Sequence, residues 1–222
     1  MSKPVVITVD GKEITVPEGE ILLWAALDQG IYIPHLCGIR EAERPAASCR
    51  LCFVEIEGIP NPVTACTQPV QEGMVVRTRT PRVDRLVRTA FELLLSNHCL
   101  GCAKCPKNRN CELQKIAKER GLKLKLTRLR PLLKEVPRDE SPDAFIYDPN
   151  RCVLCGRCVW VDHHQVKVGA IGFIRRGMER KVATFGDLKF AESRCTQCGE
   201  CVKVCPVGAL SFKKKEQEYA SK

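Results

Sequence analysis

The sequence predicts a modular α+β chain, made of several small domains rather than one large hydrophobic core. Two observations predict this fold class. Aromatic residues make up only 5% of the 222 residues, so a single large core would lack bulky side chains. The chain also has 15 cysteines, of which 14 fall into four spaced sets. Bound metal clusters are an established way to stabilise domains that are too small to build a sufficient core.

The first predicted domain, residues 1–79, has the element order of a β-grasp ferredoxin. Alternating apolar residues on either side of Asp10-Gly11 predict a β-hairpin. An apolar stretch that ends at Gly30 predicts a short helix. The expected elements are a strand pair at 4–16, a helix at 20–29 and strands at 53–57 and 74–78.

Four cysteines of this domain have the spacing C-x11-C-x2-C-x13-C. This spacing departs from the plant-type C-x4-C-x2-C…C pattern by a longer cluster loop. We therefore expect one [2Fe–2S] cluster, with the ligands Cys37, Cys49, Cys52 and Cys66.

The second predicted domain, residues 80–121, is a small helical module. A helix is expected from Pro81, because apolar residues recur on one face, and another from Glu112 to Arg120, ended by Gly121. Between them lie three predicted ligands of a [4Fe–4S] cluster, with a fourth that spacing alone leaves open between His98 and Cys99. The three are Cys102, Cys105 and Cys111.

Residues 122–145 are basic and interrupted by prolines, which predicts a linker lying over a surface. Residues 146–222 are predicted to form a ferredoxin-like domain with two [4Fe–4S] clusters and a charged tail from Lys213 onward. Its second cysteine run, C-x2-C-x2-C-x3-C-P, is the bacterial ferredoxin pattern, in which the last cysteine ligates the other cluster. The first cluster then has the ligands Cys152, Cys155, Cys158 and Cys205. Zinc sites use paired C-x2-C knuckles and need no third thiolate.

The second cluster of this domain has three clear ligands, Cys195, Cys198 and Cys201. By the two-cluster rule the fourth should follow Cys158 by four residues, but Asp162 stands there. We expect Asp162 to ligate iron through a carboxylate oxygen. The alternatives are His163 or His164 as the ligand, a [3Fe–4S] cluster without the corner iron, and loss of the cluster.

Charge and hydropathy exclude several classes of protein. The formal net charge is +10, but iron-bound thiolates would lower it to about +3, which weakens the case for nucleic-acid binding. No apolar run is long enough to span a membrane. The start of the sequence has no apolar export signal, so we expect a reducing cytoplasmic location rather than disulfides.

The order of the four sets closely resembles the N-terminal region of the large iron–sulfur subunit of respiratory complex I, and its relatives in soluble hydrogenases and formate dehydrogenases. The resemblance runs from Val5 to Leu210, and its H-x3-C-x2-C-x5-C pattern selects His98 over Cys99. Four segments carry it: Tyr32-Ile33-Pro34, Cys111-Glu112-Leu113-Gln114, Cys155-Gly156-Arg157-Cys158 and Cys205-Pro206-Val207-Gly208-Ala209-Leu210.

Both C-terminal triplets are present, as in iron-only and electron-bifurcating hydrogenases. The sequence stops about a dozen residues after Leu210, so we expect neither a hydrogen-activating nor a molybdopterin domain. The resemblance implies an electron-transfer subunit of an NAD(P)-linked hydrogenase, with one [2Fe–2S] and three [4Fe–4S] clusters. Its partners would be a flavin/NAD(P)-binding subunit, a hydrogen-oxidising subunit and a soluble ferredoxin. The alternatives are the equivalent subunit of a formate dehydrogenase, a catalytic subunit, and a zinc-dependent nucleic-acid module.

Overall fold

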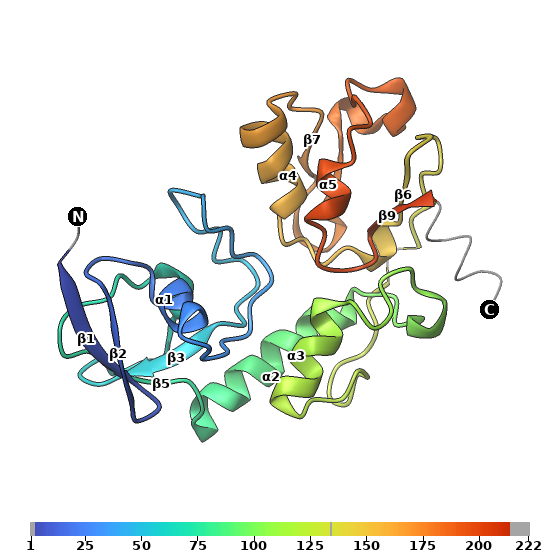
Figure 1. The fold of residues 1–222 in the computed structure, drawn as a ribbon. Coiled ribbons are helices and arrows are strands. Elements are labelled where there is room, and N and C mark those ends of the chain that lie inside the picture. The colour runs from blue at the N-terminus through green and yellow to red at the C-terminus, as the bar shows by residue number, and fades with distance from the viewer. Residues whose placement is uncertain (1–2, 134, 214–222) are drawn as a thin grey trace. The chain divides into compact units, whose positions relative to one another are not determined.

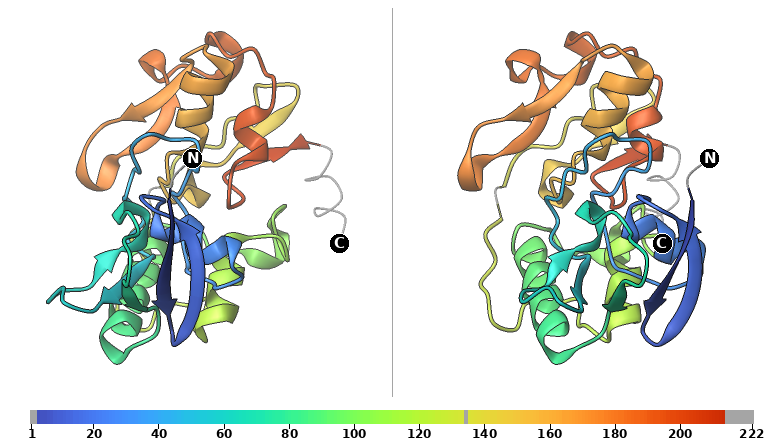
Figure 2. Two further views of the ribbon diagram at one scale, coloured as in Figure 1. Left: turned by 60° about the vertical axis from the view of Figure 1, so that its left-hand side comes forward. Right: turned by 90° about the vertical axis from the view of Figure 1, so that its left-hand side faces the viewer.

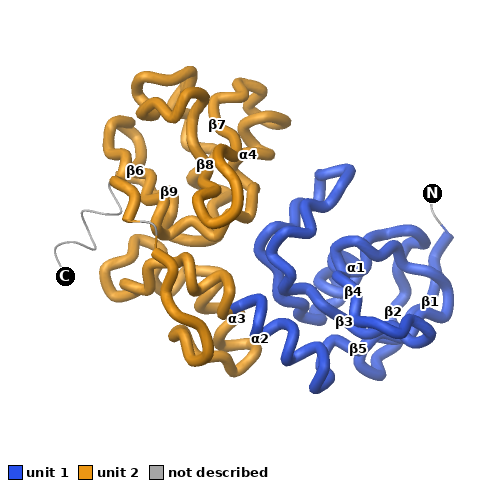
Figure 3. Tube along the Cα trace, turned by 180° about the vertical axis from the view of Figure 1, so that it is seen from behind, with its two compact units in different colours: residues 1–91 blue, residues 92–222 orange. Residues whose placement is uncertain are grey.

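The computed structural model describes residues 3–133 and 135–213, and the chain divides into two compact units, 1–91 and 92–222 (Figure 3). The division falls inside helix α2 (Pro81–Ser96). The predicted charged tail beyond Lys213 lies outside the described residues. None of the helices in the described ranges is long and apolar enough to cross a membrane.

The first unit contains a mixed five-stranded sheet with the strand order β2-β1-β5-β3-β4 (Figure 1). The predicted hairpin is confirmed, with Asp10 and Gly11 in the left-handed region at its turn. Strands β1 and β5 run parallel, whereas the other pairs are antiparallel. The elements are β1 (Pro4–Val9), β2 (Lys12–Pro17), α1 (Leu22–Asp28), β3 (Phe53–Ile56), β4 (Val63–Thr64) and β5 (Val75–Arg77).

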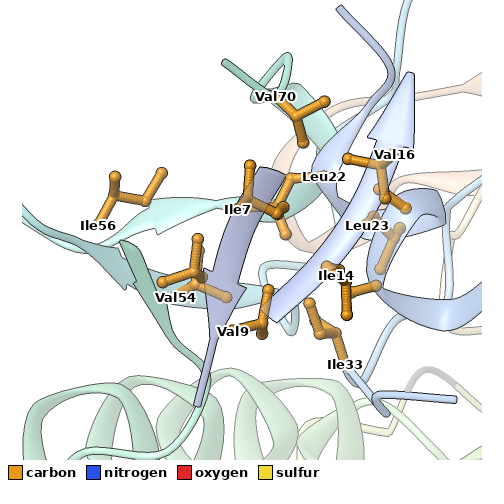
Figure 4. Close-up of a cluster of buried hydrophobic side chains, with 14 of the residues drawn as sticks. Ile7, Val9, Ile14, Val16, Leu22, Leu23, Ile33, Val54, Ile56 and Val70 are labelled. Atoms are coloured by element: carbon orange, nitrogen blue, oxygen red, sulfur yellow. The ribbon is translucent and has the colours of Figure 1, made fainter. Parts of the chain in front are cut away.

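The core of this unit lies between the sheet and α1. Alternate residues of β1, such as Val5, Ile7 and Val9, are at most 1% exposed, because successive side chains of a strand point to opposite faces. Leu22 and Leu23 of α1 are fully buried in the same cluster, which Figure 4 shows in close-up. This core supports the loops that carry the first four cysteines.

Helix α2 begins at Pro81, as the sequence predicts, and α3 (Glu112–Arg120) begins and ends where the sequence predicts. Pro81 is the first residue of α2, and the Thr80 hydroxyl accepts a hydrogen bond from the Val83 amide at 3.1 Å. Such a cap satisfies a backbone donor that the first helical turn leaves free. Gly121 ends α3 with a φ of 63°, a conformation that glycine adopts without strain.

The predicted linker, 122–145, is part of the second unit, and hydrogen bonds join it to other elements of that unit at several points. The buried Glu92 carboxylate accepts bonds from Thr127 Oγ1 and Arg128 Nε at 2.7 and 3.0 Å. Further along, the side-chain amide of Asn150 accepts a hydrogen bond from the backbone N–H of Val136 and donates one to the carbonyl oxygen of Val136. The segment therefore has fixed contacts with the elements on both sides of it.

The C-terminal part of the second unit consists of two similar halves. Strand β6 (Phe145–Tyr147) pairs with β9 (Leu210–Phe212), and each half contains one short helix, α4 (Arg157–Val161) or α5 (Glu200–Lys203). A hairpin of β7 (Ile171–Ile174) and β8 (Lys181–Thr184) separates the halves. Figure 2 shows it in orange. This hairpin was not predicted from the sequence.

Short 3-10 turns complete the structure at Ala65–Thr67, Cys102–Lys104, Pro149–Arg151, Gly177–Glu179, Phe185–Asp187 and Phe190–Glu192. The chain is thus a modular protein of mixed helices and strands, as the sequence predicts.

Candidate iron–sulfur sites

The first set lies in loops beside the N-terminal sheet, where all four cysteines are buried. The thiols of Cys37 and Cys49 are 3.4 Å apart. Two thiolates on one tetrahedral metal ion lie roughly 3.8 Å apart when the metal–sulfur bonds are about 2.3 Å. The hydrogen bond with the Cys49 thiol lowers the pKa of Cys37 to about 5.

Cys52 and Cys66 form a second pair in the same region. A hydrogen bond with Cys66 raises the pKa of Cys52, and the same bond lowers the pKa of Cys66. The two pairs also interact electrostatically, Cys52 with Cys49 and Cys66 with Cys37. Two adjacent thiol pairs provide two ligands for each iron of a [2Fe–2S] cluster.

The second set follows α2. His98 is only 7% exposed, and its Nδ1 lies 2.9 Å from the carbonyl oxygen of Arg151. Because a carbonyl can only accept, Nδ1 carries the proton and Nε2 is left unprotonated. This arrangement is how proteins orient a histidine that ligates a metal through its other nitrogen. Burial lowers the pKa of His98, which also favours the neutral ring.

Burial raises the pKa of Cys111, and the charges of Cys105 and Cys102 act in the same direction. The three cysteines of this set therefore lie near one another. Cys99, the rival fourth ligand, is half-buried, and its amide donates to the Asn150 carbonyl at 2.8 Å. The structure therefore brings the ring of His98 into an oriented, buried position beside this set.

The third set is assembled from two distant segments. Cys152, Cys155 and Cys158 precede or begin α4, whereas Cys205 follows α5. Burial raises the pKa of Cys158, and the charges of the other three thiols act in the same direction. The fold thus brings these four thiols close together.

The fourth set surrounds a small cavity. Asp162 lines this cavity together with Cys195, Cys198, Cys201 and apolar residues such as Phe190. Burial raises the pKa of Cys201 to about 12, with the other thiols adding to it. Asp162 is 8% exposed and begins a π-helical turn, Asp162–Val166. Its Oδ2 accepts from the Ile171 amide at 3.0 Å, which anchors one carboxylate oxygen and leaves Oδ1 as a donor for a metal.

The two histidines proposed as alternatives have other contacts. His163 Nε2 lies 2.9 Å from the carbonyl oxygen of Ile171. His164 is exposed, stacks on Trp160 at 4.9 Å and places Nδ1 3.0 Å from the Trp160 carbonyl. Of the three candidates, Asp162 is therefore the residue that lines the cavity.

The backbone of the two C-terminal loops repeats in detail. Leu154 and Gln197 both have positive φ, and their amides lie 3.4 Å from the thiols of Cys152 and Cys195. Gly156 and Gly199 follow with φ near 80° as the residues before α4 and α5. Hydrogen bonds to sulfur of this kind are a means of tuning cluster potentials.

The donor sets and loops fit iron–sulfur clusters. Within the described ranges, no three His, Cys, Asp or Glu side chains are grouped as ligands of a single metal ion. Gly208 shows how tightly the loops pack, because a Cβ there would lie 2.5 Å from Cys105 Sγ. Sequence reasoning did not single out Gly208 or Arg151, since their roles depend on contacts between distant segments.

Three family models match consecutive parts of the chain. Residues 2–81 match a 2Fe-2S iron-sulfur cluster binding domain. Residues 88–124 match the NADH-ubiquinone oxidoreductase-G iron-sulfur binding region. Residues 145–211 match the ferredoxin-like domain of NADH-quinone oxidoreductase subunit 3.

Individual proteins resemble nearly the whole chain. NADP-reducing hydrogenase subunit HndD of Solidesulfovibrio fructosivorans is 38% identical over 96% of this chain. The alpha subunit of NADPH-Fe(3+) oxidoreductase of Geobacter sulfurreducens is 38% identical over 93%. The alignments cover only 36% and 24% of those two proteins, so the chain spans about a third or a quarter of their length.

A solved structure resembles the chain over most of both molecules. A chain of an NAD+-reducing [NiFe]-hydrogenase crystallised in the H2-reduced state is 31% identical, with a TM-score of 0.84. The match covers 94% of this chain and 87% of that one. The chain therefore belongs to the family of iron–sulfur subunits shared by NAD(P)-linked hydrogenases and the NADH-quinone oxidoreductases of respiratory complex I.

Proposed function

We propose that this chain carries one [2Fe–2S] and three [4Fe–4S] clusters, and that it transfers single electrons without substrate chemistry of its own. The proposed domains are 1–79, 80–121 and 146–222, joined by the linker 122–145. The proposed ligand sets are Cys37, Cys49, Cys52 and Cys66; His98, Cys102, Cys105 and Cys111; Cys152, Cys155, Cys158 and Cys205; and Cys195, Cys198, Cys201 and Asp162.

The observation that carries this proposal is the assembly of distant thiols into four separate groups within one chain. When bound, the clusters supply one-electron chemistry. The chain's own residues place the ligands and bury several of them. They also set the charge and the hydrogen bonds around the sulfur atoms, which tune the potentials.

The proposed parent complex is an NAD(P)-linked hydrogenase. Supporting this, a structurally similar chain belongs to an NAD+-reducing [NiFe]-hydrogenase, and a relative is named as a subunit of an NADP-reducing hydrogenase. We propose a flavin/NAD(P)-binding subunit and a hydrogen-oxidising subunit as partners in the cytoplasm, with a soluble ferredoxin as a further partner. Exposed basic residues such as Lys123, Arg130 and Arg138 provide positive charge for acidic partner surfaces.

The first test is the iron and acid-labile sulfide content of the anaerobically purified chain, together with its low-temperature EPR spectra. Four complete clusters contain about 14 iron atoms and give no [3Fe–4S] signal when oxidised. About 13 iron atoms with that signal would place a [3Fe–4S] cluster at Cys195, Cys198 and Cys201. About 10 would show that this site is lost, and a colourless protein with zinc would refute the proposal.

The second test concerns the complex. The chain, tagged and purified gently from its source, should co-purify with subunits that reduce NAD(P)+ with hydrogen. Co-purification with a formate-oxidising activity instead would assign the chain to a formate dehydrogenase. Hydrogen uptake by the isolated chain with an artificial acceptor would show that it is itself a catalytic subunit.

A further inference from the structure

A buried arginine with an unused hydrogen-bond donor, Nη1, lies between two of the proposed cluster sites. Nitrogens Nε and Nη1 of Arg151 are buried without a hydrogen-bond partner among the described atoms. The side chain is 12% exposed, and Nε lies 3.2 Å from Asp148 Oδ2, which is also largely buried. An unpaired buried donor is costly, so each one in a folded protein calls for an explanation.

The backbone of Arg151 connects directly to the second ligand set. Its carbonyl oxygen holds Nδ1 of His98 at 2.9 Å. The next residue, Cys152, belongs to the third set. Arg151 is therefore positioned by contacts that depend on both sites.

The side chain of Arg151 is directed toward the His98 set. An added Cβ on Gly208 would lie 2.5 Å from Cys105 Sγ and 3.6 Å from Arg151 Nη1, so the guanidinium and this thiol approach the same point. This approach, together with the hydrogen bond between its carbonyl and His98, places Arg151 beside the proposed ligands His98 and Cys105.

We propose that Arg151 is a positioning and tuning residue, which holds His98 through its carbonyl and raises the reduction potential of the cluster at His98, Cys102, Cys105 and Cys111 through its guanidinium. The inference rests on the proposed function, because it requires a cluster at this site. Reduction adds one negative charge to the cluster, and a nearby positive charge in a site shielded from water stabilises that state. A sulfur atom of the cluster would also be an acceptor for the unused Nη1 donor.

Asp148 should have the opposite effect. Its carboxylate oxygen Oδ2 lies 3.2 Å from Nε of the same guanidinium, so its negative charge opposes the positive charge of Arg151. Loss of the Arg151 charge should lower the reduction potential of the cluster, and neutralising Asp148 should therefore raise it. Asn at position 148 keeps an oxygen that can accept from the Asn150 amide, as Asp148 Oδ1 does at 3.1 Å.

The test is a mediated redox titration of the full chain with all its clusters, followed by EPR. The EPR signal of this cluster is identified as the one that the His98→Ala variant, which keeps Arg151, has lost. We expect Arg151→Gln to lower the equilibrium constant for reduction of this cluster about tenfold, a shift of about 59 mV for one electron. Arg151→Lys should keep most of the potential, and Asp148→Asn should shift it upward.

The matched control is Lys104→Gln, which removes the same charge from an exposed position in the same cluster loop. Solvent screens an exposed charge, so its effect should be several times smaller. A potential in Arg151→Gln that is unchanged, or that moves no more than in Lys104→Gln, would overturn the inference. If the Arg151→Gln protein does not contain the cluster, the Asp148→Asn variant provides the test. An unchanged or lower potential of the cluster in that variant also overturns the inference. Absence of the signal and of the corresponding iron from the wild-type chain would instead refute the proposed function.

Discussion

Gly208 offers a direct test of how closely the C-terminal domain packs against the His98 set. Its backbone is not in the left-handed region, so alanine is excluded by space rather than by conformation. The Cβ of Gly208→Ala would lie 2.5 Å from Cys105 Sγ. Non-bonded carbon and heavier atoms prefer separations of about 3.5–4.0 Å, so the thiol or the loop must move by about 1 Å.

A movement of this size has two consequences. Forcing an extra carbon into a packed site costs about 1–3 kcal/mol, which corresponds to a lower thermal midpoint by about 2–12 °C for a chain of this length. Metal–ligand distances tolerate only about 0.2 Å, so Cys105 would also be displaced as a ligand. We therefore expect Gly208→Ala to lose or alter one [4Fe–4S] cluster, while the clusters on the other sets persist.

The assay is the iron content, the EPR spectrum and the thermal midpoint of the variant under anaerobic conditions. Gly172→Ala in strand β7 is the matched control, because an added Cβ there meets no atom within 4 Å. That substitution should be neutral or slightly stabilising. If Gly208→Ala keeps all its iron, an unchanged spectrum and a midpoint equal to that of Gly172→Ala, the close approach of Gly208 to Cys105 is wrong.

Three further predictions address other parts of the chain. His98→Ala should lose or alter the cluster signal of the second set while Cys99→Ser keeps it, and the reverse result by EPR would make Cys99 the ligand. Asp10→Ala should destabilise the first unit by about 1–3 kcal/mol, because Asp10 accepts bonds from the Thr78 amide and hydroxyl at 2.7 and 2.6 Å. A midpoint of Asp10→Ala equal to that of the unsubstituted chain would contradict this. Glu92→Gln should speed amide hydrogen exchange at 127–128, whose side chains Glu92 binds, and unchanged exchange would show that these bonds do not hold the segment.

Local signals predicted most of the helices and strands up to α3, but none of those that follow it. The Asp10-Gly11 turn, Pro81 at the start of α2 and Gly121 at the end of α3 act through backbone preferences that are visible in a single sequence. The β7–β8 hairpin was missed, because its strands are short and no tight turn dipeptide separates them. The contact of Asp10 with Thr78 was also beyond reach, since it joins the hairpin turn to a residue far along the chain.

Cysteine spacing predicted which thiols group together, but it did not predict which other residues surround them. Short C-x2-C turns bring neighbouring thiols together whatever the rest of the fold does. The position of Asp162, four residues after Cys158, already favoured it over His163 in the sequence, and the structure adds that Asp162 lines the cavity of the fourth set, whereas His163 contacts the Ile171 carbonyl. Buried partners such as Arg151 leave no local signal, since nothing near them in the sequence shows which thiols they approach.

One short turn explains why the His98 set belongs to the same compact unit as the C-terminal domain, although a long basic segment separates them in sequence. The carbonyl oxygens of Asn150 and Arg151 accept from the Cys99 amide and from His98, respectively. Cys152, the next residue, begins the third set. A rigid connection of this kind fixes the ligands of two neighbouring sites relative to each other, as a functional site needs from its supporting residues. Substitutions that displace the backbone of this turn should therefore disturb both sites together.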